Sequence, residues 1–115
     1  MAGEIAYTKL MCNELELINA IVIPYSASMR NRPGTPDRII VHAYWMGFLE
    51  FKGEKTPIKK NQELTIKEMN KRQPGCAFIV RKPGVVEDHI GNWLGSFKTA
   101  KELIVLLVEL KKSMN

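Results

Sequence analysis

The chain has 115 residues, of which 45% are hydrophobic and 25% charged, and its formal net charge is +5 at pH 7. This composition fits one folded domain and excludes an intrinsically disordered segment. Two isolated cysteines, Cys12 and Cys76, exclude a disulfide-rich module. The longest apolar run, 103–108, is far shorter than the ~18 residues of a membrane span, and no apolar leader is visible, so we expect a cytosolic protein.

The positive charge is concentrated in the middle of the chain. Residues 30–82 hold twelve of the seventeen basic residues but five of the twelve acidic ones, so this window carries +7 and the rest carries −2. A local basic field suits a polyphosphate partner such as DNA. A solvated, lysine-rich helix face gives the same count, so charge alone leaves both interpretations open.

The first third of the chain predicts a helix, a strand and a loop. Apolar residues at helical spacing indicate a helix over 4–18, and a short β-branched run over 20–25 indicates a strand that ends near Pro24. Residues 26–36 are rich in Ser, Asn, Arg, Gly and Pro, which is typical of a loop. The residues expected on the buried face of the helix are Ile5, Met11, Leu15 and Ile18.

The middle of the chain predicts two strands, over 38–44 and 46–52, followed by a helix and a buried strand over 76–80. Thr56-Pro57 is a typical helix start, with Thr as the cap and Pro at the first helical position, and this helix is expected to end near Arg72. A strand, a helix and a strand in this order imply a parallel pair with a right-handed crossover.

The pattern weakens after Pro83-Gly84, where 90–97 indicates a short strand or a loop. The sequence from Thr99 to Glu102 matches a capping box and predicts a helix to about Lys112. The fold class is therefore α/β, with a mixed central sheet flanked by helices. We expect one domain over 1–115, with a core over about 4–82 and a C-terminal extension over 83–115.

The C-terminal helix carries six consecutive apolar residues, 103–108, which point all round the helix. A helix on the surface of a monomer needs an apolar stripe on one side only. We therefore expect a homodimer joined partly through this helix. The alternative is that residues 83–98 fold over the helix and bury its outer side within one chain.

Candidate catalytic residues lie on the second strand of the hairpin. Side chains alternate across a strand, so Glu50 and Lys52 share one face while Leu49 and Phe51 take the other. Asp37 opens the neighbouring strand, and a hairpin would bring it beside Glu50. Two carboxylates with a lysine suit phosphodiester hydrolysis with Mg²⁺ or Mn²⁺, although a surface Glu–Lys pair has the same spacing.

The segment Gly34-Thr35-Pro36-Asp37, the triplet Glu50-Phe51-Lys52 and Gln62 together resemble the PD-(D/E)XK nuclease superfamily. Within it they are most similar to the virus-type replication-repair nuclease (VRR-NUC) family of bacteriophages and eukaryotic DNA-repair proteins. The resemblance covers roughly residues 4–82 and implies the order helix, strand, Gly-x-Pro-Asp, hairpin, Glu-x-Lys, Gln-bearing helix and strand. It implies a restriction-endonuclease-like core and a stand-alone, phage-type member of the family.

The resemblance also implies the roles of single residues. Asp37 and Glu50 would be metal ligands, with the Phe51 carbonyl as a third, and Lys52 would be the catalytic lysine. Gln62 matches the glutamine of the family's helix, and periodicity independently places it on the same face as Ile58, Ile66 and Met69. An acid of the first helix also belongs to the family's site: Glu4 fits best, with Glu14 and Glu16 as rivals.

The expected activity is hydrolysis of DNA by a metal-dependent endonuclease, and the resemblance favours branched or flapped DNA in replication, recombination or repair. Two alternatives remain: a DNA-binding module of the same fold without turnover, and a restriction-type enzyme that recognises a short sequence. The residues expected to contact phosphates come from the loop before Asp37 and from the start of the predicted helix. They are Arg30, Arg32, Lys59 and Lys60.

Overall fold

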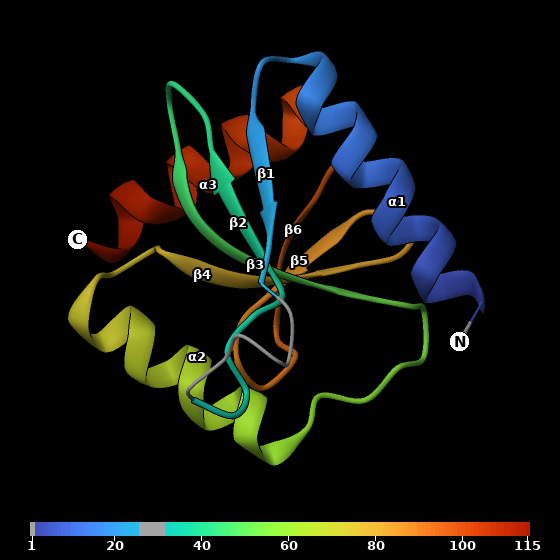
Figure 1. Cartoon of the computed structure of the whole chain (residues 1–115). Coiled ribbons are helices and arrows are strands. Elements are labelled where there is room, and N and C mark those ends of the chain that lie inside the picture. Colours follow the sequence, from blue (N-terminus) through green and yellow to red (C-terminus); the bar gives the residue numbers. More distant parts are fainter. Residues whose placement is uncertain (1, 26–31) are drawn as a thin grey trace.

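The computed structural model describes residues 2–25 and 32–115, and within these residues the chain forms three helices and six strands (Figure 1). No helix in this part of the chain combines the length and the apolar character that crossing a membrane requires. In chain order the elements are α1 (Ala2–Leu17), β1 (Ile21–Pro24), β2 (Arg38–Val41), β3 (Met46–Lys52), α2 (Lys60–Arg72), β4 (Ala77–Arg81), β5 (Val85–Glu87), β6 (Trp93–Ser96) and α3 (Ala100–Met114).

The six strands form one sheet in the order β1-β2-β3-β4-β5-β6. The β3–β4 pair is parallel and the other four pairs are antiparallel. A parallel neighbour cannot be reached by a tight turn, and here α2 makes the connection from β3 to β4. The structure therefore confirms the mixed α/β fold and the predicted parallel pair.

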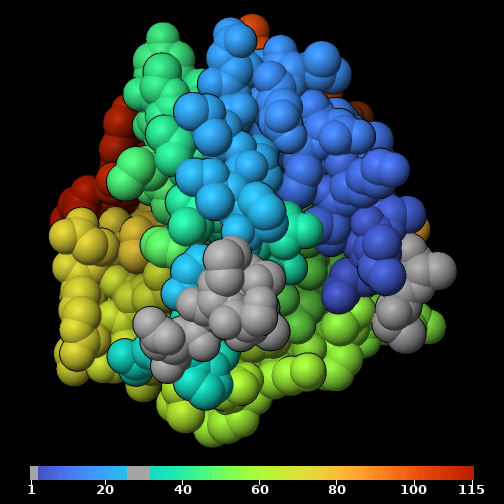
Figure 2. Space-filling model, in the orientation of Figure 1, coloured from blue at the N-terminus to red at the C-terminus, as the bar shows by residue number. Residues whose placement is uncertain are grey.

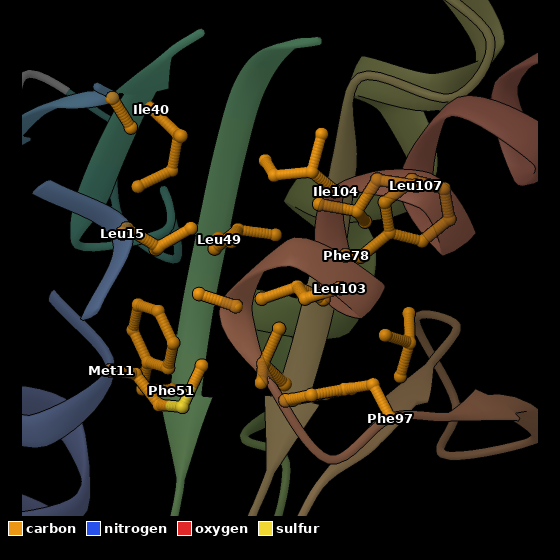
Figure 3. Packing of buried hydrophobic residues seen from close by; sticks show 14 of the residues in the cluster. Met11, Leu15, Ile40, Leu49, Phe51, Phe78, Phe97, Leu103, Ile104 and Leu107 are labelled. Atoms are coloured by element: carbon orange, nitrogen blue, oxygen red, sulfur yellow. The ribbon is translucent and has the colours of Figure 1, made fainter. Parts of the chain in front are cut away.

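The sheet has an apolar cluster on each face. The larger cluster packs α1 and α3 against one face, and the smaller one packs Ile66 of α2 against Ala77 and Ile79 on the other. Figure 3 shows the larger cluster, with β3 between side chains of α1 and of α3. Its buried members include Met11, Leu15, Ile40, Leu49, Phe51, Phe78, Val80, Leu103, Ile104 and Leu107.

Residues 83–115 complete this core. β5 and β6 extend the sheet beyond β4, and α3 contributes four buried residues to the larger cluster, namely Ala100, Leu103, Ile104 and Leu107. The segment expected as an extension therefore shares its core with the segment that carries the motifs.

The apolar run 103–108 is largely covered within the chain. A Cβ on Gly95 of β6 would lie 2.7 Å from the Leu106 side chain, so this glycine leaves the space that Leu106 fills. Leu106 and Val108 are half-buried, and Val105, at 56% exposure, is the one strongly exposed residue of the run. Gly95 belongs to the sheet, so this contact widens the side of α3 that packs on the sheet, while Val105 lies on the exposed side. The homodimer stays a prediction, with less apolar surface to support it.

The first helix buries a different stripe from the predicted one. Ile5 is 68% exposed, whereas Tyr7, Met11 and Leu15 are buried, so the prediction for Ile5 was wrong. Ile5 precedes Met11 by six residues, which at 3.6 residues per turn places the two about 120° apart on the helix. The residues four apart, Met11 and Leu15, carry the buried face.

The second helix begins three residues later than predicted. It starts at Lys60 with Lys59 as its N-cap, not at Thr56-Pro57. As an N-cap, Thr56 would accept the first hydrogen bond of the helix through its carbonyl, but this carbonyl accepts a hydrogen bond from the Arg81 guanidinium (2.7 Å). Thr56 is thus held outside the helix, although Ile58 still packs on the smaller cluster.

Two strand predictions also needed correction. β2 ends at Val41 instead of Tyr44, because His42 donates its N–H to the Trp45 carbonyl (3.0 Å) and closes the turn of the hairpin. β5, over Val85–Glu87, was not predicted, because three residues are too few to show an alternating pattern. β6 falls within the predicted segment 90–97.

Tyr7 provides a test of the packing of α1. Its hydroxyl is buried without a hydrogen bond among the described residues, and burial, with a smaller effect of Glu14, raises its pKa to about 12. The unfolded chain therefore loses this proton from about pH 10, earlier than the folded chain does, and the free energy of unfolding must fall as the pH rises toward 12.

We expect Tyr7→Phe to retain stability at neutral pH and to reduce this alkaline loss by on the order of 2 kcal/mol, as measured by urea unfolding between pH 9 and pH 12. Tyr44→Phe is the matched control, because Tyr44 is 79% exposed. The same alkaline loss in wild type and Tyr7→Phe would contradict the burial of the hydroxyl.

Candidate active site

β3 places two charged side chains inside the protein. Phe48, Glu50 and Lys52 point toward α2, while Leu49 and Phe51 belong to the core on the other face. Glu50 and Lys52 are only 7% and 3% exposed. The prediction that they share one face is confirmed, but they do not form a surface pair. A buried charge of this kind costs free energy unless it has partners.

Gln62 of α2 supplies those partners. The Lys52 ammonium donates to the Gln62 Oε1 (2.7 Å), and the Gln62 amide donates to the Glu50 Oε2 (3.3 Å). The Lys52 Nζ and the Glu50 Oε2 lie 3.8 Å apart. The predicted position of Gln62 on the inner face of its helix is thus confirmed, and its amide links both charged groups.

The same glutamine also organises the start of α2. The Lys59 backbone N–H donates to the Gln62 Oε1 (3.1 Å), which satisfies one of the N–H groups that a helix start leaves without a partner. The position at which α2 begins and the position of the Lys52 ammonium therefore depend on one side chain.

Asp37 lies directly beside Glu50. Arg38 pairs with Leu49 in the hairpin, so the preceding residue, Asp37, comes opposite Glu50, and its backbone N–H donates to the Glu50 Oε1 (3.1 Å). The Asp37 side chain is 32% exposed, which makes it more accessible than Glu50 or Lys52. The hairpin thus brings the two predicted metal ligands together.

The turn before Asp37 packs on the first turns of α2, and this contact explains its glycine. Gly34 has φ +86°, and a Cβ on it would lie 2.0 Å from the Asn61 carbonyl oxygen. Only glycine adopts this conformation readily and allows such an approach. The Thr65 hydroxyl donates to the Pro33 carbonyl (2.8 Å), which fixes the turn further along the helix. The packing of this turn on α2 therefore positions both Asp37, which follows the turn, and Gln62, which lies in the first turn of the helix.

Glu4 contacts the end of β3 from the first helix. Its Oε1 accepts the N–H of Gly53, the residue after Lys52, at 3.1 Å. Glu4 and Asp37 both line a cleft of about 400 Å³ between α1 and the β1–β2 pair, and Figure 2 shows α1 beside β1 on this side of the molecule. Glu16 lines the same cleft, whereas Glu14 does not. Of the three acids of α1, Glu4 is the one that contacts the end of β3.

The sequence did not single out two arginines that contact the site residues, Arg81 and Arg38. Arg81, the β4 neighbour of Lys52, donates to both carboxylate oxygens of Glu87 (3.0 Å each) and to the Gly53 and Thr56 carbonyls (2.9 and 2.7 Å). It thereby holds the segment that joins β3 to α2. The sequence did contain one indication of this role: Arg81 is a charged residue directly after the apolar run of β4.

Arg38 forms an ion pair with the Asp37 carboxylate. Its Nη1 lies 3.3 Å from the Asp37 Oδ2 and donates to the Asp37 carbonyl at 2.9 Å. Arg38 and Cys12 both line the cleft; burial raises the pKa of the Cys12 thiol, and the nearby Arg38 guanidinium opposes the effect. The sequence pattern did not indicate that the Arg38 side chain would contact the preceding residue, Asp37.

The residues predicted to bind DNA are exposed where the structure describes them. Arg32, Lys59 and Lys60 are on the surface, and Lys59 and Lys60 flank the start of α2, close to Gln62 in the chain. Lys60 pairs with Glu63 at 3.6 Å while its side chain stays 75% exposed. Arg30 lies outside the described residues.

The donor set suits a hard cation that keeps water ligands. The described residues contain no group of three or more His, Cys, Asp or Glu side chains placed to hold a metal ion. Mg²⁺ is commonly bound by one or two carboxylates, with waters and substrate phosphates as its other ligands. A site for such a cation at Asp37 and Glu50 stays a prediction: the Glu50 carboxylate contacts the Asp37 backbone N–H, and the Asp37 carboxylate contacts Arg38. The Phe51 side chain is in the core, and the ligand role of its carbonyl stays a prediction.

Comparison of the sequence with known proteins gave no support for a family: no family model matches the chain, and no curated protein matches it significantly.

The buried pair gives a test of this geometry. Lys52→Met leaves the Glu50 carboxylate buried without its cation, so we expect a loss of about 3 kcal/mol in the free energy of unfolding, measured with urea at neutral pH. Lys60→Met removes a lysine from an exposed ion pair and should change stability by less than about 1 kcal/mol. Equal small losses in both variants would show that Lys52 does not neutralise Glu50 inside the protein.

Proposed function

We propose that the chain is a metal-dependent endonuclease that hydrolyses phosphodiester bonds in DNA. One observation carries the proposal: Glu50, Lys52 and Gln62 form a single buried hydrogen-bonded network, and Asp37 lies beside it. A Glu–Lys pair with only a structural role has no need of a neighbouring acid or of a link to the start of a helix. Phosphodiester hydrolysis uses all of these groups.

The order of the elements supports the same proposal. The chain runs α1, β1, β2, β3, α2, β4, with Gly34 to Asp37 before β2, Glu50 to Lys52 in β3 and Gln62 in α2. This is the order that the resemblance to the VRR-NUC family of PD-(D/E)XK nucleases implies. β5, β6 and α3 follow this core.

In this proposal Asp37 and Glu50 hold Mg²⁺ or Mn²⁺, with the Phe51 carbonyl and Glu4 as further donors. The bound cation supplies the charge that polarises the phosphate and acidifies a water molecule. Lys52 positions the water and offsets the charge that develops in the transition state. Gln62 keeps the ammonium oriented through its 2.7 Å hydrogen bond.

The buried position of Glu50 and Lys52 indicates the side from which a substrate arrives. Both are almost covered, whereas Asp37 is 32% exposed and opens onto the cleft beside α1. A scissile phosphate would therefore reach the site at the end of β3 and the start of β2, past Asp37. The preference for branched or flapped DNA rests on the resemblance to the VRR-NUC family.

The proposed substrate is branched, junction or flap DNA in replication, recombination or repair, in the cytoplasm of the cell or of a phage's host. A DNA-binding module without turnover and a restriction-type enzyme are the alternatives. Incubation with Mg²⁺ and a junction, a flap, plain duplex and plasmid distinguishes the three. Cleavage of branched substrates supports the proposal, discrete plasmid fragments support the restriction-type enzyme, and binding without cleavage supports the module.

Substitution of the site residues tests the reaction. Asp37→Asn and Glu50→Gln should abolish Mg²⁺-dependent cleavage, and Lys52→Met should slow it by roughly 10²-fold or more, as expected when a group that stabilises transition-state charge is lost. Glu109→Gln is the matched control, because Glu109 belongs to an exposed ion pair with Lys112. Each variant is first checked for folding by circular dichroism. Wild-type rates in folded Asp37→Asn would contradict the assignment.

A second test concerns the basic window. Reversal of Arg32, Lys59 and Lys60 to Glu should weaken DNA binding by roughly tenfold or more and flatten its dependence on salt, since each phosphate contact releases counterions. Reversal of Lys98, Lys101 and Lys112, which are equally exposed, is the control with the same change in net charge. Fluorescence anisotropy in EDTA measures both sets. Equal losses from the two sets would show that the basic window does not form the contact surface.

A further inference from the structure

The guanidinium of Arg38 lies against the Asp37 carboxylate, which the proposed function assigns to a metal ion. Its Nη1 contacts both the Asp37 carboxylate (3.3 Å) and the Asp37 carbonyl (2.9 Å). Both side chains line the cleft beside α1. Any cation that binds the Asp37 carboxylate must therefore share it with Arg38 or displace it.

The charges that line the cleft favour competition between Arg38 and a divalent cation for the Asp37 carboxylate. Its lining holds three acids, Glu4, Glu16 and Asp37, and two bases, Lys9 and Arg38. Without Arg38 the acids would exceed the bases further, which favours a divalent cation. With Arg38 against Asp37, one of these three carboxylates is paired with a base of the cleft.

We propose that Arg38 is a positioning residue that exchanges between two anions: it neutralises Asp37 in the metal-free protein and contacts a DNA phosphate once a divalent cation takes that carboxylate. This inference rests on the proposed function, because it requires Asp37 to be a metal ligand. It adds a residue that is not part of the carboxylate, lysine and glutamine motif. It also predicts that metal and substrate bind in a linked manner.

The strength and the geometry of the Arg38–Asp37 contact fit this role. Both side chains are partly exposed, at 26% and 32%, so their ion pair is weak enough to be broken by a divalent cation. The guanidinium is planar and carries several donors, so after release it can bind a phosphate through two hydrogen bonds. Lysine in this position would supply a charge without that second hydrogen bond.

Metal affinity measured without DNA tests the first half of the exchange. Mn²⁺ alone is titrated into protein, and the free ion is followed by electron paramagnetic resonance. Arg38→Met should bind Mn²⁺ more tightly than wild type, by up to about fivefold, the factor that corresponds to a weak ion pair. Lys9→Met is the matched control: it removes the same charge from the same cleft and should change the affinity much less. In an Asp37→Asn background, Arg38→Met should have no effect.

Cleavage measured on the same variants tests the second half. Arg38→Met should cut DNA more slowly than wild type at saturating Mn²⁺, although it binds the ion more tightly, and Arg38→Lys should recover part of the rate. A folding defect would lower both affinity and rate, so opposite changes identify the exchange. If wild type binds Mn²⁺ and cleaves but Arg38→Met binds it no more tightly than Lys9→Met, the exchange is wrong and the nuclease proposal stands. If neither wild type nor Arg38→Met binds Mn²⁺, the metal site of the proposed function fails, and the exchange fails with it.

Discussion

The burial of one ammonium and one carboxylate on the same face of β3 is the constraint on which the rest of this site depends. Lys52 and Glu50 lose nearly all contact with water, so each needs partners inside the protein. Gln62 provides them, and its position requires α2 to begin where it does. The turn at Gly34 must then approach the helix closely, and Arg81 must hold the connecting segment.

The two faces of the sheet differ in the side chains that they bury: one is apolar, and the other also holds charged groups. Leu49 and Phe51 join a large apolar core with α1 and α3, while Glu50 and Lys52 face α2, where the apolar cluster is small. A buried ion pair usually adds little net stability, because the cost of desolvation offsets the attraction between the charges. The larger core therefore stabilises a sheet whose other face holds polar groups. Such a division is common where a protein retains charged groups for a function.

The position of the site at the end of two strands explains its mixture of buried and accessible groups. Asp37 precedes β2 and Gly53 follows β3, so both lie where the hydrogen-bonded ladder ends. At that end the sheet no longer covers Asp37, and α1 contributes Glu4 to the same region. In the proposed function this accessibility would let Asp37 reach a large anionic substrate, whereas Glu50 and Lys52 keep their geometry because they are covered.

The sequence by itself determined the local patterns: the alternation along β3, the inward position of Gln62 on its helix, the cap of α3 at Thr99 and the parallel pair that a strand, a helix and a strand require. These follow from periodicities of a few residues and from the conformations open to single residues. The pairing of Asp37 with Glu50 was also predictable, because a hairpin leaves few alternatives for its register.

Only the tertiary structure decided the contacts between distant segments. Arg81 donates a hydrogen bond to the Thr56 carbonyl, and α2 begins after this residue. Glu4 accepts a hydrogen bond from Gly53, which is 49 positions away in the chain. Leu106 packs against Gly95 of β6. Arg38 turns to its neighbour Asp37 because the cleft beside α1 holds both side chains. Such contacts depend on which atoms packing brings together, and short-range periodicity carries no information about distances between segments far apart in the chain.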